Sequence, residues 1–165
     1  MYNQYLRIRP NNDGVYTIID IPANVPILEF IGDIKTDKEI KGHMDVDKYL
    51  QMGPDLFLSP VEAINGHHFM SHSCDPNSML YIVGNRVIVY SLYVIPANHN
   101  ITYDYSTSST DTYDSWKMDC VCGSYKCRKI ISGYQYLNDE IKSDYEKRGM
   151  VPMFISMPNL FSKRW

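Results

Sequence analysis

The sequence predicts a single, mainly β domain with few helices. Its 165 residues suit one domain, and a hydrophobic share of 44% against a charged share of 21% is ordinary for a folded chain. Short apolar runs bounded by proline, glycine or asparagine recur along the chain, which is typical of short strands. They do not alternate with helical segments as in βαβ units, and a glycine-rich dinucleotide fingerprint is missing. These observations argue against a Rossmann-type dehydrogenase or methyltransferase.

The expected elements follow in chain order. Two apolar runs at 15–21 and 26–34, separated by prolines, predict two strands joined by a turn. A short helix is expected over 36–44, because Thr36 and Glu39 fit a capping box at its start. The further expected elements are a strand at 56–59, a helix at 61–70, strands at 81–83 and 86–95 joined by a hairpin turn at Gly84 and Asn85, a strand at 101–105 and a loop at 106–114.

The longest helix is expected over 134–148. Asn138 or Asp139 near its start can cap the first backbone N–H groups of the helix. Gly149 just past its end suits the left-handed conformation in which many helices stop, and two prolines then interrupt the tail.

Charge and hydropathy limit the expected partners. The formal net charge is −3, so the chain lacks the excess of basic residues that is typical of nucleic-acid-binding proteins, and direct nucleic-acid binding is not expected. A slightly acidic chain is compatible with a basic partner. No run approaches the roughly 18 apolar residues of a membrane span, and the start of the chain lacks the apolar core of a signal peptide. We therefore expect an intracellular protein of the cytoplasm or nucleus, in a host cell if it is viral or a secreted effector. The oligomeric state stays open.

Three cysteines lie close together and a fourth lies far upstream. Cys120, Cys122 and Cys127 offer three soft ligands, one fewer than the four that structural zinc sites use. Cys74 is the only other cysteine and completes such a site if folding brings it near the rest. Two alternatives stay open here: the thiols are buried as small apolar side chains, or Cys120 and Cys122 form a redox pair that holds no zinc.

Four segments resemble, in order, the motifs of SET-domain protein-lysine methyltransferases. The segment SHSCDPN at 71–77 resembles the family's NHSCxPN signature, and ITYDY at 101–105 resembles [IL]TFDY. The segment CVCGSYKCR at 120–128 is similar to the post-SET pattern CxCGSxxCR, and LEFIGD at 28–33 is similar to LEYxGE. The match runs over about residues 6–130, most of the chain, and looks most like small stand-alone members from bacteria or viruses.

The resemblance implies a SET fold of small curved β-sheets, in which 71–77 and 101–105 form a knot-like core. It implies a SET core at 1–115, a post-SET zinc segment at 116–132 and a C-terminal helical extension at 133–165. We expect that extension to pack over the donor or peptide cleft. The zinc ligands that the resemblance implies are Cys74, Cys120, Cys122 and Cys127.

The resemblance also implies methyl transfer from S-adenosyl-L-methionine to a lysine of a protein or peptide, with a histone tail as a candidate substrate. A lysine amine with an ordinary pKa near ~10.4 must lose its proton before it can attack, and tyrosine rings can strip water from it. Tyr105 occupies the position of the family's catalytic tyrosine, and the alternative is a half-buried strand tyrosine. Tyr103 occupies a position that varies between Phe and Tyr, where a tyrosine implies that the reaction stops mainly at monomethyl-lysine.

The donor site is assigned by the same resemblance. The segment DGVY at 13–16 resembles the family's GxGV[FY] turn, and Ser71 with His72 aligns with its Asn-His pair. Tyr49 resembles a tyrosine of the second conserved block. The expected donor-binding residues are therefore Asp13, Gly14, Val15, Tyr16, Tyr49, Ser71, His72 and Tyr105. His67 and His68 are expected at the surface or in a cleft, without a metal role.

Three positions depart from the family pattern. Asn12 replaces the first glycine of GxG, Ser71 replaces the asparagine of NHSC, and NHN at 98–100 replaces the usual GEE. A serine offers one hydroxyl where asparagine offers an amide and a carbonyl, so weaker donor binding is one consequence. The alternative function is therefore a catalytically weak or inactive SET-like zinc-containing module that binds a peptide. Thermal stabilisation by the methyl donor distinguishes the two.

Overall fold

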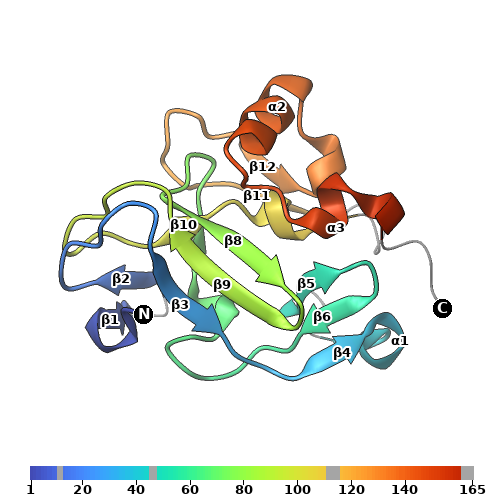
Figure 1. Cartoon of the computed structure of the whole chain (residues 1–165), viewed down its shortest axis with the longest axis horizontal. Helices are drawn as coiled ribbons and strands as arrows, with labels where there is room; N and C mark the ends of the chain where they lie inside the picture. Colours follow the sequence, from blue (N-terminus) through green and yellow to red (C-terminus); the bar gives the residue numbers. More distant parts are fainter. Residues whose placement is uncertain (11–12, 45–47, 111–115, 161–165) are drawn as a thin grey trace.

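Small antiparallel sheets dominate the protein. The computed structural model describes residues 1–10, 13–44, 48–110 and 116–160. Within these ranges the strands form five sheets, none with more than three strands, and the few helices lie mainly at the C-terminal end (Figure 1). This architecture confirms the mainly β fold class with small sheets.

The central sheet has the strand order β3-β9-β8 and is antiparallel throughout. It comprises β3 (Pro26–Phe30), β8 (Ser78–Val83) and β9 (Arg86–Ser91). Gly84 has a φ of +55° in the turn between β8 and β9, so the expected hairpin is confirmed. Its buried apolar side chains, such as Leu28 and Val89, join the main hydrophobic core.

A second sheet has the order β4-β6-β5, from β4 (Ile34–Thr36), β6 (Leu56–Leu58) and β5 (Leu50–Gly53). The strand β5 is buried along its whole length and so lacks the polar–apolar alternation that marks a strand in sequence. The helix α1 (Asp37–Ile40) follows β4 directly. The expected capping box is present, because Thr36 donates from both its backbone N–H and its hydroxyl to Glu39 at 2.8 Å. The helix is shorter than the expected 36–44.

Three two-stranded pairs complete the set. β1 (Leu6–Ile8) pairs antiparallel with β2 (Val15–Thr17). β7 (Ser71–His72) pairs in parallel with β10 (Thr102–Tyr103), although the two strands lie far apart in sequence. Near the end of the chain, β11 (Lys117–Asp119) pairs antiparallel with β12 (Ile130–Ser132).

The expected helix over 61–70 is wrong. This stretch turns back on itself and contains only a 3-10 helix at His67–Phe69. Gly66 lies so close to the carbonyl oxygens of Val61 and Ala63 that a side chain there would clash, and Asn65 donates to the Glu29 carbonyl at 3.2 Å. Tertiary contacts therefore override the helical composition. Further 3-10 helices lie at Asn3–Tyr5, Tyr105–Ser108, Tyr134–Tyr136 and Pro158–Leu160.

The expected strand over 101–105 is only two residues long, and its end is capped. Asp104 accepts a hydrogen bond from the Ser106 N–H at 3.0 Å and so begins the 3-10 helix that contains Tyr105. This 3-10 helix occupies the start of the expected 106–114 loop. Residues 111–115 of that loop lie outside the described residues.

The C-terminal helix begins later than expected. It is α2 (Asp139–Lys147), and the Asn138 side chain accepts from the Ile141 N–H at 2.8 Å as its N-cap. Gly149 follows the helix with a φ of +66°, as expected. A short helix α3 (Met153–Ser156) comes next, and both helices lie on the same side of the molecule as β11 and β12 (Figure 1).

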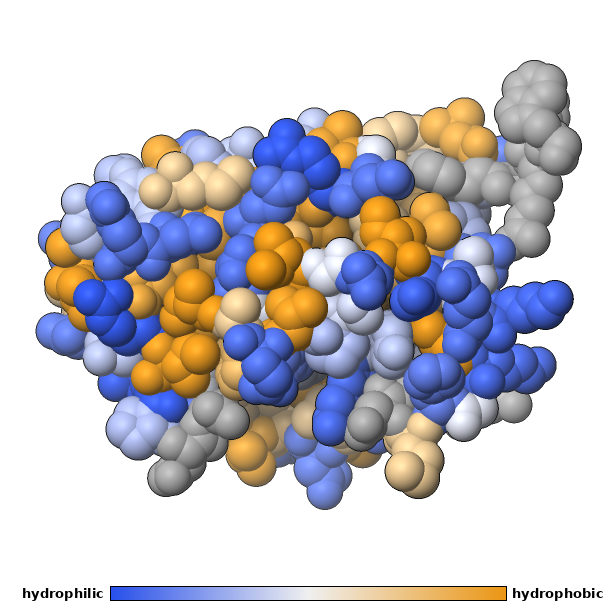
Figure 2. Space-filling view, turned by 90° about the horizontal axis from the view of Figure 1, so that it is seen from below, coloured by the Kyte–Doolittle hydropathy of each residue, from blue (hydrophilic) through white to orange (hydrophobic). Residues whose placement is uncertain are grey.

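One main core and two smaller clusters hold these elements together. The main core unites the central sheet, β5 and the β7–β10 pair, and one smaller cluster packs the C-terminal helices on Met79 and Leu92. On the face drawn in Figure 2, apolar side chains form small groups interrupted by hydrophilic ones. None of the helices in the described ranges has the length and apolar character to span a bilayer.

Candidate active site and cysteine cluster

Two distant segments meet at the centre of the site, which we call the knot (residues 71–77 and 100–105). Ser71 and His72 of β7 pair with Thr102 and Tyr103 of β10. The Asn77 amide donates to the Asn100 carbonyl at 2.7 Å, and its oxygen accepts from the Thr102 N–H at 2.9 Å. One side chain thus pairs both a donor and an acceptor of the neighbouring strand.

A pocket of about 330 Å³ opens beside the knot. Aromatic rings make up much of its wall, and polar side chains with a few apolar ones complete it. Its lining includes Tyr49, Phe57, His67, Tyr103, Tyr105 and Trp116. A pocket walled mainly by aromatic rings suits a long aliphatic side chain, and it strips water from a charged group at the end of that chain.

Tyr103 and Tyr105 stand next to each other in this wall, with ring centroids 5.0 Å apart. The Tyr105 hydroxyl donates to the Met70 carbonyl at 2.6 Å, and its oxygen keeps lone pairs that can accept from an amine. Burial raises the pKa of Tyr105 to about 12, and burial also raises the pKa of Tyr103 well above its ordinary value. Both phenols are therefore neutral at physiological pH.

His67 is a buried wall residue of the pocket, and its ring packs edge-on against Phe30. Its Nε2 lies 2.7 Å from the Lys48 carbonyl, which can only accept, so Nε2 carries the proton. Burial lowers the pKa of His67 to about 4, and the ring is therefore neutral at physiological pH. His68 lines the same pocket, so the expectation of a cleft position applies to both histidines.

The turn before β2 packs tightly against the knot. Gly14 has a φ of +100°, and a side chain there would clash with the Ser71 hydroxyl and come within 2.9 Å of the Asn100 amide nitrogen. Asp13 is exposed, Tyr16 is half-buried, and Val15 is fully buried in the main core. Gly14 and Ser71, both expected in the donor site, thus lie next to each other, and neither lines the pocket of the tyrosine pair.

Asn100 and Arg9 brace this turn, and sequence reasoning missed both roles. Arg9 donates through Nε to the Asn100 side-chain oxygen at 2.5 Å and through Nη2 to the Asn98 carbonyl at 2.6 Å. The Asn100 amide donates in turn to the Asp13 carbonyl at 3.3 Å. The NHN departure at 98–100 therefore supplies hydrogen bonds to the Gly14 turn. Asn12, the other departure in that turn, lies outside the described residues.

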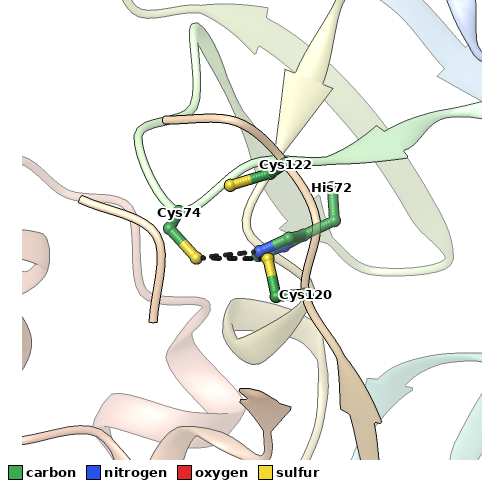
Figure 3. A group of neighbouring side chains, drawn as sticks. All are labelled: His72, Cys74, Cys120 and Cys122. Carbon is green, nitrogen blue, oxygen red and sulfur yellow. Dashed lines mark hydrogen bonds between the residues drawn. The ribbon is translucent and has the colours of Figure 1, made fainter. Parts of the chain in front are cut away.

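The cysteines lie close together, and Tyr105 packs against their cluster. The potential ligand atoms of His72, Cys74, Cys120 and Cys122 all lie within 4.8 Å of one another (Figure 3). The Cys74 and Cys120 sulfurs are 3.7 Å apart, and His72 Nε2 lies 3.2 Å from the Cys74 sulfur. Folding therefore brings Cys74 to the downstream cysteines, as expected, and adds an imidazole that the sequence analysis assigned to the donor site.

Cys127 borders this group. Its thiol donates to the Cys120 carbonyl at 3.4 Å and packs against the same small cluster. Burial raises the pKa of Cys74 to about 12. Burial opposes ionisation of Cys122 too, but hydrogen bonds from the Cys74 and Ser124 backbones lower its pKa to about 7. All four thiols are free, and three thiols beside an imidazole are a donor set that suits a tetrahedral metal such as zinc.

A buried carboxylate joins the knot to the cysteine segment. Asp104 is 1% exposed and forms a two-point ion pair with Arg128, at 2.6 and 2.8 Å. Tyr145 donates to the same carboxylate at 2.7 Å from α2. Sequence reasoning missed all three residues, although Asp104 and Arg128 stand inside the quoted motifs; nothing in the sequence marked Tyr145.

Comparisons with known proteins agree with the arrangement. A family model described as the SET domain matches residues 12–106. The chain is 28% identical over 130 residues to Histone-lysine N-methyltransferase trithorax of Drosophila virilis, a match that covers 72% of this chain and 3% of that protein. It is 28% identical over 131 residues to Histone-lysine N-methyltransferase ash1 of Drosophila melanogaster, covering 73% of this chain and 6% of that protein.

A solved structure is similar as well. The crystal structure of KRYPTONITE in complex with mCHG DNA and SAH superposes with a TM-score of 0.60 at 24% identity. The match covers 74% of this chain and 28% of that one. The chain thus spans only a small part of the relatives it matches, and the likeness to KRYPTONITE is one of fold.

Proposed function

The chain belongs to the SET-domain family, and we propose that it is a protein-lysine N-methyltransferase that uses S-adenosyl-L-methionine. The single observation that carries the proposal is the position of Tyr103 and Tyr105 side by side in the wall of an aromatic pocket next to the knot. The names of the curated relatives, which are histone-lysine N-methyltransferases, support the same activity.

The pocket supports the chemistry that such a transfer needs. A lysine side chain entering it exchanges water for aromatic rings, and this loss of solvation lowers the pKa of its amine. Tyr105 is neutral and its hydroxyl is fixed on Met70, so its oxygen can accept from the amine and orient the nitrogen. Because the phenol is a weaker acid than an ordinary tyrosine, we assign it positioning and leave proton removal to solvent.

The methyl donor is proposed to bind on the other side of the knot, near the turn at Gly14. S-adenosyl-L-methionine supplies a methyl group on a positively charged sulfur, the group that the neutral amine attacks. Asp13, Gly14, Val15, Tyr16, Ser71 and His72 remain the candidate donor residues, with Tyr49 and Tyr105 on the pocket side. The close packing of Gly14 against Ser71 supports this placement, because it brings two of the candidate donor residues together. The similar structure of KRYPTONITE was solved in complex with SAH.

Zinc is the proposed metal of the cysteine cluster. Cys74, Cys120 and Cys122 would supply three thiolates, and we propose Cys127 as the fourth ligand. His72 is the alternative fourth ligand, because its Nε2 lies among the three sulfurs. When bound, the metal would join the knot to the post-SET segment at 116–132, between a SET core at 1–115 and a C-terminal extension at 133–165. Zinc content in Cys127→Ser and His72→Ala variants decides between the two ligands.

The substrate is proposed to be a protein or peptide lysine, with a histone tail as the first candidate. A second crystal structure of KRYPTONITE is a complex with an H3(1-15) peptide. The net charge of −3 on this chain is compatible with a basic peptide. We further propose an intracellular location, which the four free thiols support because reducing compartments keep cysteines available to metals.

The product is proposed to be mainly monomethyl-lysine. Tyr103 is 4% exposed, and its ring lies in the pocket wall with its centroid 5.0 Å from that of Tyr105. A phenylalanine there removes one oxygen and makes room for an amine that already carries a methyl group. Mass spectrometry of the product tests this: Tyr103→Phe should shift the product toward dimethyl- and trimethyl-lysine. Abundant trimethyl-lysine from the unmodified protein would exclude the proposal.

A radiolabelled transfer assay tests the function itself. Wild-type protein, labelled methyl donor and a core-histone mixture should give labelled histone, and Tyr105→Phe should reduce the rate by about 100-fold. The donor or its homocysteine product should also raise the melting temperature of both proteins, since Tyr105→Phe removes one hydroxyl and leaves the ring and the other candidate donor residues in place. Donor-independent melting together with unlabelled histones would instead favour a peptide-binding SET-like module.

A further inference from the structure

Asp104 stands between the two tyrosines of the pocket and is almost completely buried. Its carboxylate accepts from the Ser106 N–H at 3.0 Å, which fixes the turn that carries Tyr105. A carboxylate taken out of water needs several strong hydrogen-bond donors to remain charged in place. The groups that donate to Asp104 therefore fix the position of the backbone from Tyr103 to Tyr105.

Two of these partners come from segments beyond the knot. The Arg128 guanidinium forms a bidentate ion pair with Asp104, donating to one carboxylate oxygen at 2.6 Å and to the other at 2.8 Å. The Tyr145 hydroxyl donates to Oδ2 at 2.7 Å. Tyr145 is the buried residue of α2. Its hydroxyl therefore connects the C-terminal helix to Asp104, which lies between the two tyrosines of the pocket.

The carboxylate also borders the cysteine cluster. Its Oδ1 lies 3.5 Å from His72 Nδ1, and the Tyr105 N–H donates to the same His72 nitrogen at 3.2 Å. The His72 ring is thus bonded to the Tyr105 backbone and lies beside Asp104 without a hydrogen bond to it. The hydrogen bonds that connect Asp104 to the Tyr105 segment are those to Ser106 and its neighbours.

Helix α2 does not need this hydroxyl to stay attached. The rings of Tyr134 and Tyr145 pack with Leu137 and Met150 in an apolar cluster, which also takes in Met79 of β8. Removal of the Tyr145 hydroxyl keeps the ring in that cluster. The contribution of the hydroxyl to the hydrogen bonds of Asp104 can thus be separated from the contribution of the ring to folding.

We propose that Tyr145 is a positioning residue for methyl transfer: with Arg128 it clamps Asp104 and so holds the Tyr103–Tyr105 pair in its working geometry. The C-terminal helix is then part of the active site, although it contributes no residue to the pocket wall. This inference rests on the proposed methyltransferase function.

The test compares Tyr145→Phe with Tyr134→Phe in the full-length protein. Tyr134 is the matched control, because its hydroxyl also meets an acidic side chain of α2, Glu146 at 3.2 Å, but away from Asp104. We expect Tyr145→Phe to lower kcat about ten-fold with the KM for the histone peptide within two-fold of wild type. Tyr134→Phe should leave both constants unchanged at a temperature where all three proteins are folded.

A fluorine NMR experiment gives a readout that does not depend on turnover. In protein labelled with 3-fluorotyrosine, the Tyr105 resonance is assigned by its loss in Tyr105→Phe. Tyr145→Phe should shift that resonance, and Tyr134→Phe should leave it in place. An unmoved Tyr105 resonance, or a kcat within two-fold of wild type, would overturn the inference.

The two proposals fail in different ways. If wild-type protein transfers no methyl group, the proposed function is wrong, and the fluorine shift still decides whether Tyr145 holds Tyr105. If wild type is active and Tyr145→Phe matches it in rate and spectrum, the function stands and the positioning role is wrong.

Discussion

The knot and the cysteine segment, which we define as residues 117–132, lie next to each other and are held in opposite ways. The knot is held by its own hydrogen bonds: Asn77 bonds the Asn100 and Thr102 backbones, and the Ser78 hydroxyl donates to the Thr102 carbonyl at 2.8 Å. It is continuous with the main core through Met70 and Tyr103. The chain itself therefore supplies what this region needs to fold.

The cysteine segment has little core of its own. All three residues of β11 are exposed, and Val121 between two cysteines is 93% exposed. Its buried side chains are Cys120 and Ile131, within the part of the chain that the structure describes. Burial of so few apolar side chains does little to offset the entropy of ordering this segment, so thiol–metal bonds at the proposed zinc site would supply much of its stability.

Removal of the proposed metal should give the largest effect, and the effect should fall on the cysteine segment and not on the central sheet. Treatment with 1,10-phenanthroline, or the Cys120→Ser substitution, should speed amide hydrogen exchange in 117–132 by about 100-fold or more. Strands β8 and β9 should keep their protection, because their hydrogen bonds do not involve the cysteines. Exchange mass spectrometry measures both regions in one sample. Val121→Ala is the matched control, and equal loss of protection in β9 would show that the two regions do not fold independently.

The second largest effect should fall on the knot. Asn77→Ala removes one donor and one acceptor for half-buried backbone groups, so it should lower the free energy of unfolding by about 1–3 kcal/mol. Urea unfolding measures it, and Asn85→Ala in the exposed β8–β9 turn should change it by less than about 0.5 kcal/mol. A loss below about 1 kcal/mol for Asn77→Ala would mean that the knot depends on packing instead.

Local chemistry explains which parts of the fold were predictable. The Thr36–Glu39 capping box, the turn at Gly84 and the Asn138 cap depend on residues a few positions apart, so their patterns predicted them. The helix expected over 61–70 failed because Asn65 bonds to the distant strand β3, a contact that no local pattern records.

The same distinction applies to the site. Cys74 was linked to the downstream cysteines by counting thiols, and Tyr103 with Tyr105 by the ITYDY motif. The roles of Asn100 and Tyr145 arise from side chains that meet across the fold, at separations of 87 and 41 residues from their partners. Only the folded chain could reveal them.

His67 provides a pH test of the region that leads into the knot. Its pKa of about 4 lies below the ordinary value of 6.5 because of burial, so between these values the unfolded chain binds a proton that the folded chain does not. The contribution of neutral His67 to the free energy of unfolding is complete above pH 6.5, and it is lost as the pH falls toward 4. The loss should be about 3 kcal/mol at most.

The measurement compares wild type with His67→Gln between pH 7 and pH 4.5 by urea unfolding. The glutamine amide can donate to the Lys48 carbonyl but does not titrate in this range. His68, whose ring lies 6.0 Å away, and the neighbouring wall residues Lys48 and Tyr103 are present in both proteins, so the comparison isolates the change at His67. Parallel pH profiles for the two proteins would contradict a neutral, buried His67.

The smallest effect should come from the ion pair that links the two regions at the surface. Lys126 of the cysteine segment donates to Asp75 of the knot at 2.8 Å, but the two side chains are 49% and 32% exposed. An exposed pair contributes less than about 1 kcal/mol, and salt screens it. Lys126→Ala should therefore change the melting temperature only slightly at low salt and leave the rate of metal release within about three-fold of wild type. If Lys126→Ala instead raised the rate of metal release as much as Cys120→Ser does, the ion pair would be the main contact that holds the cysteine segment against the knot.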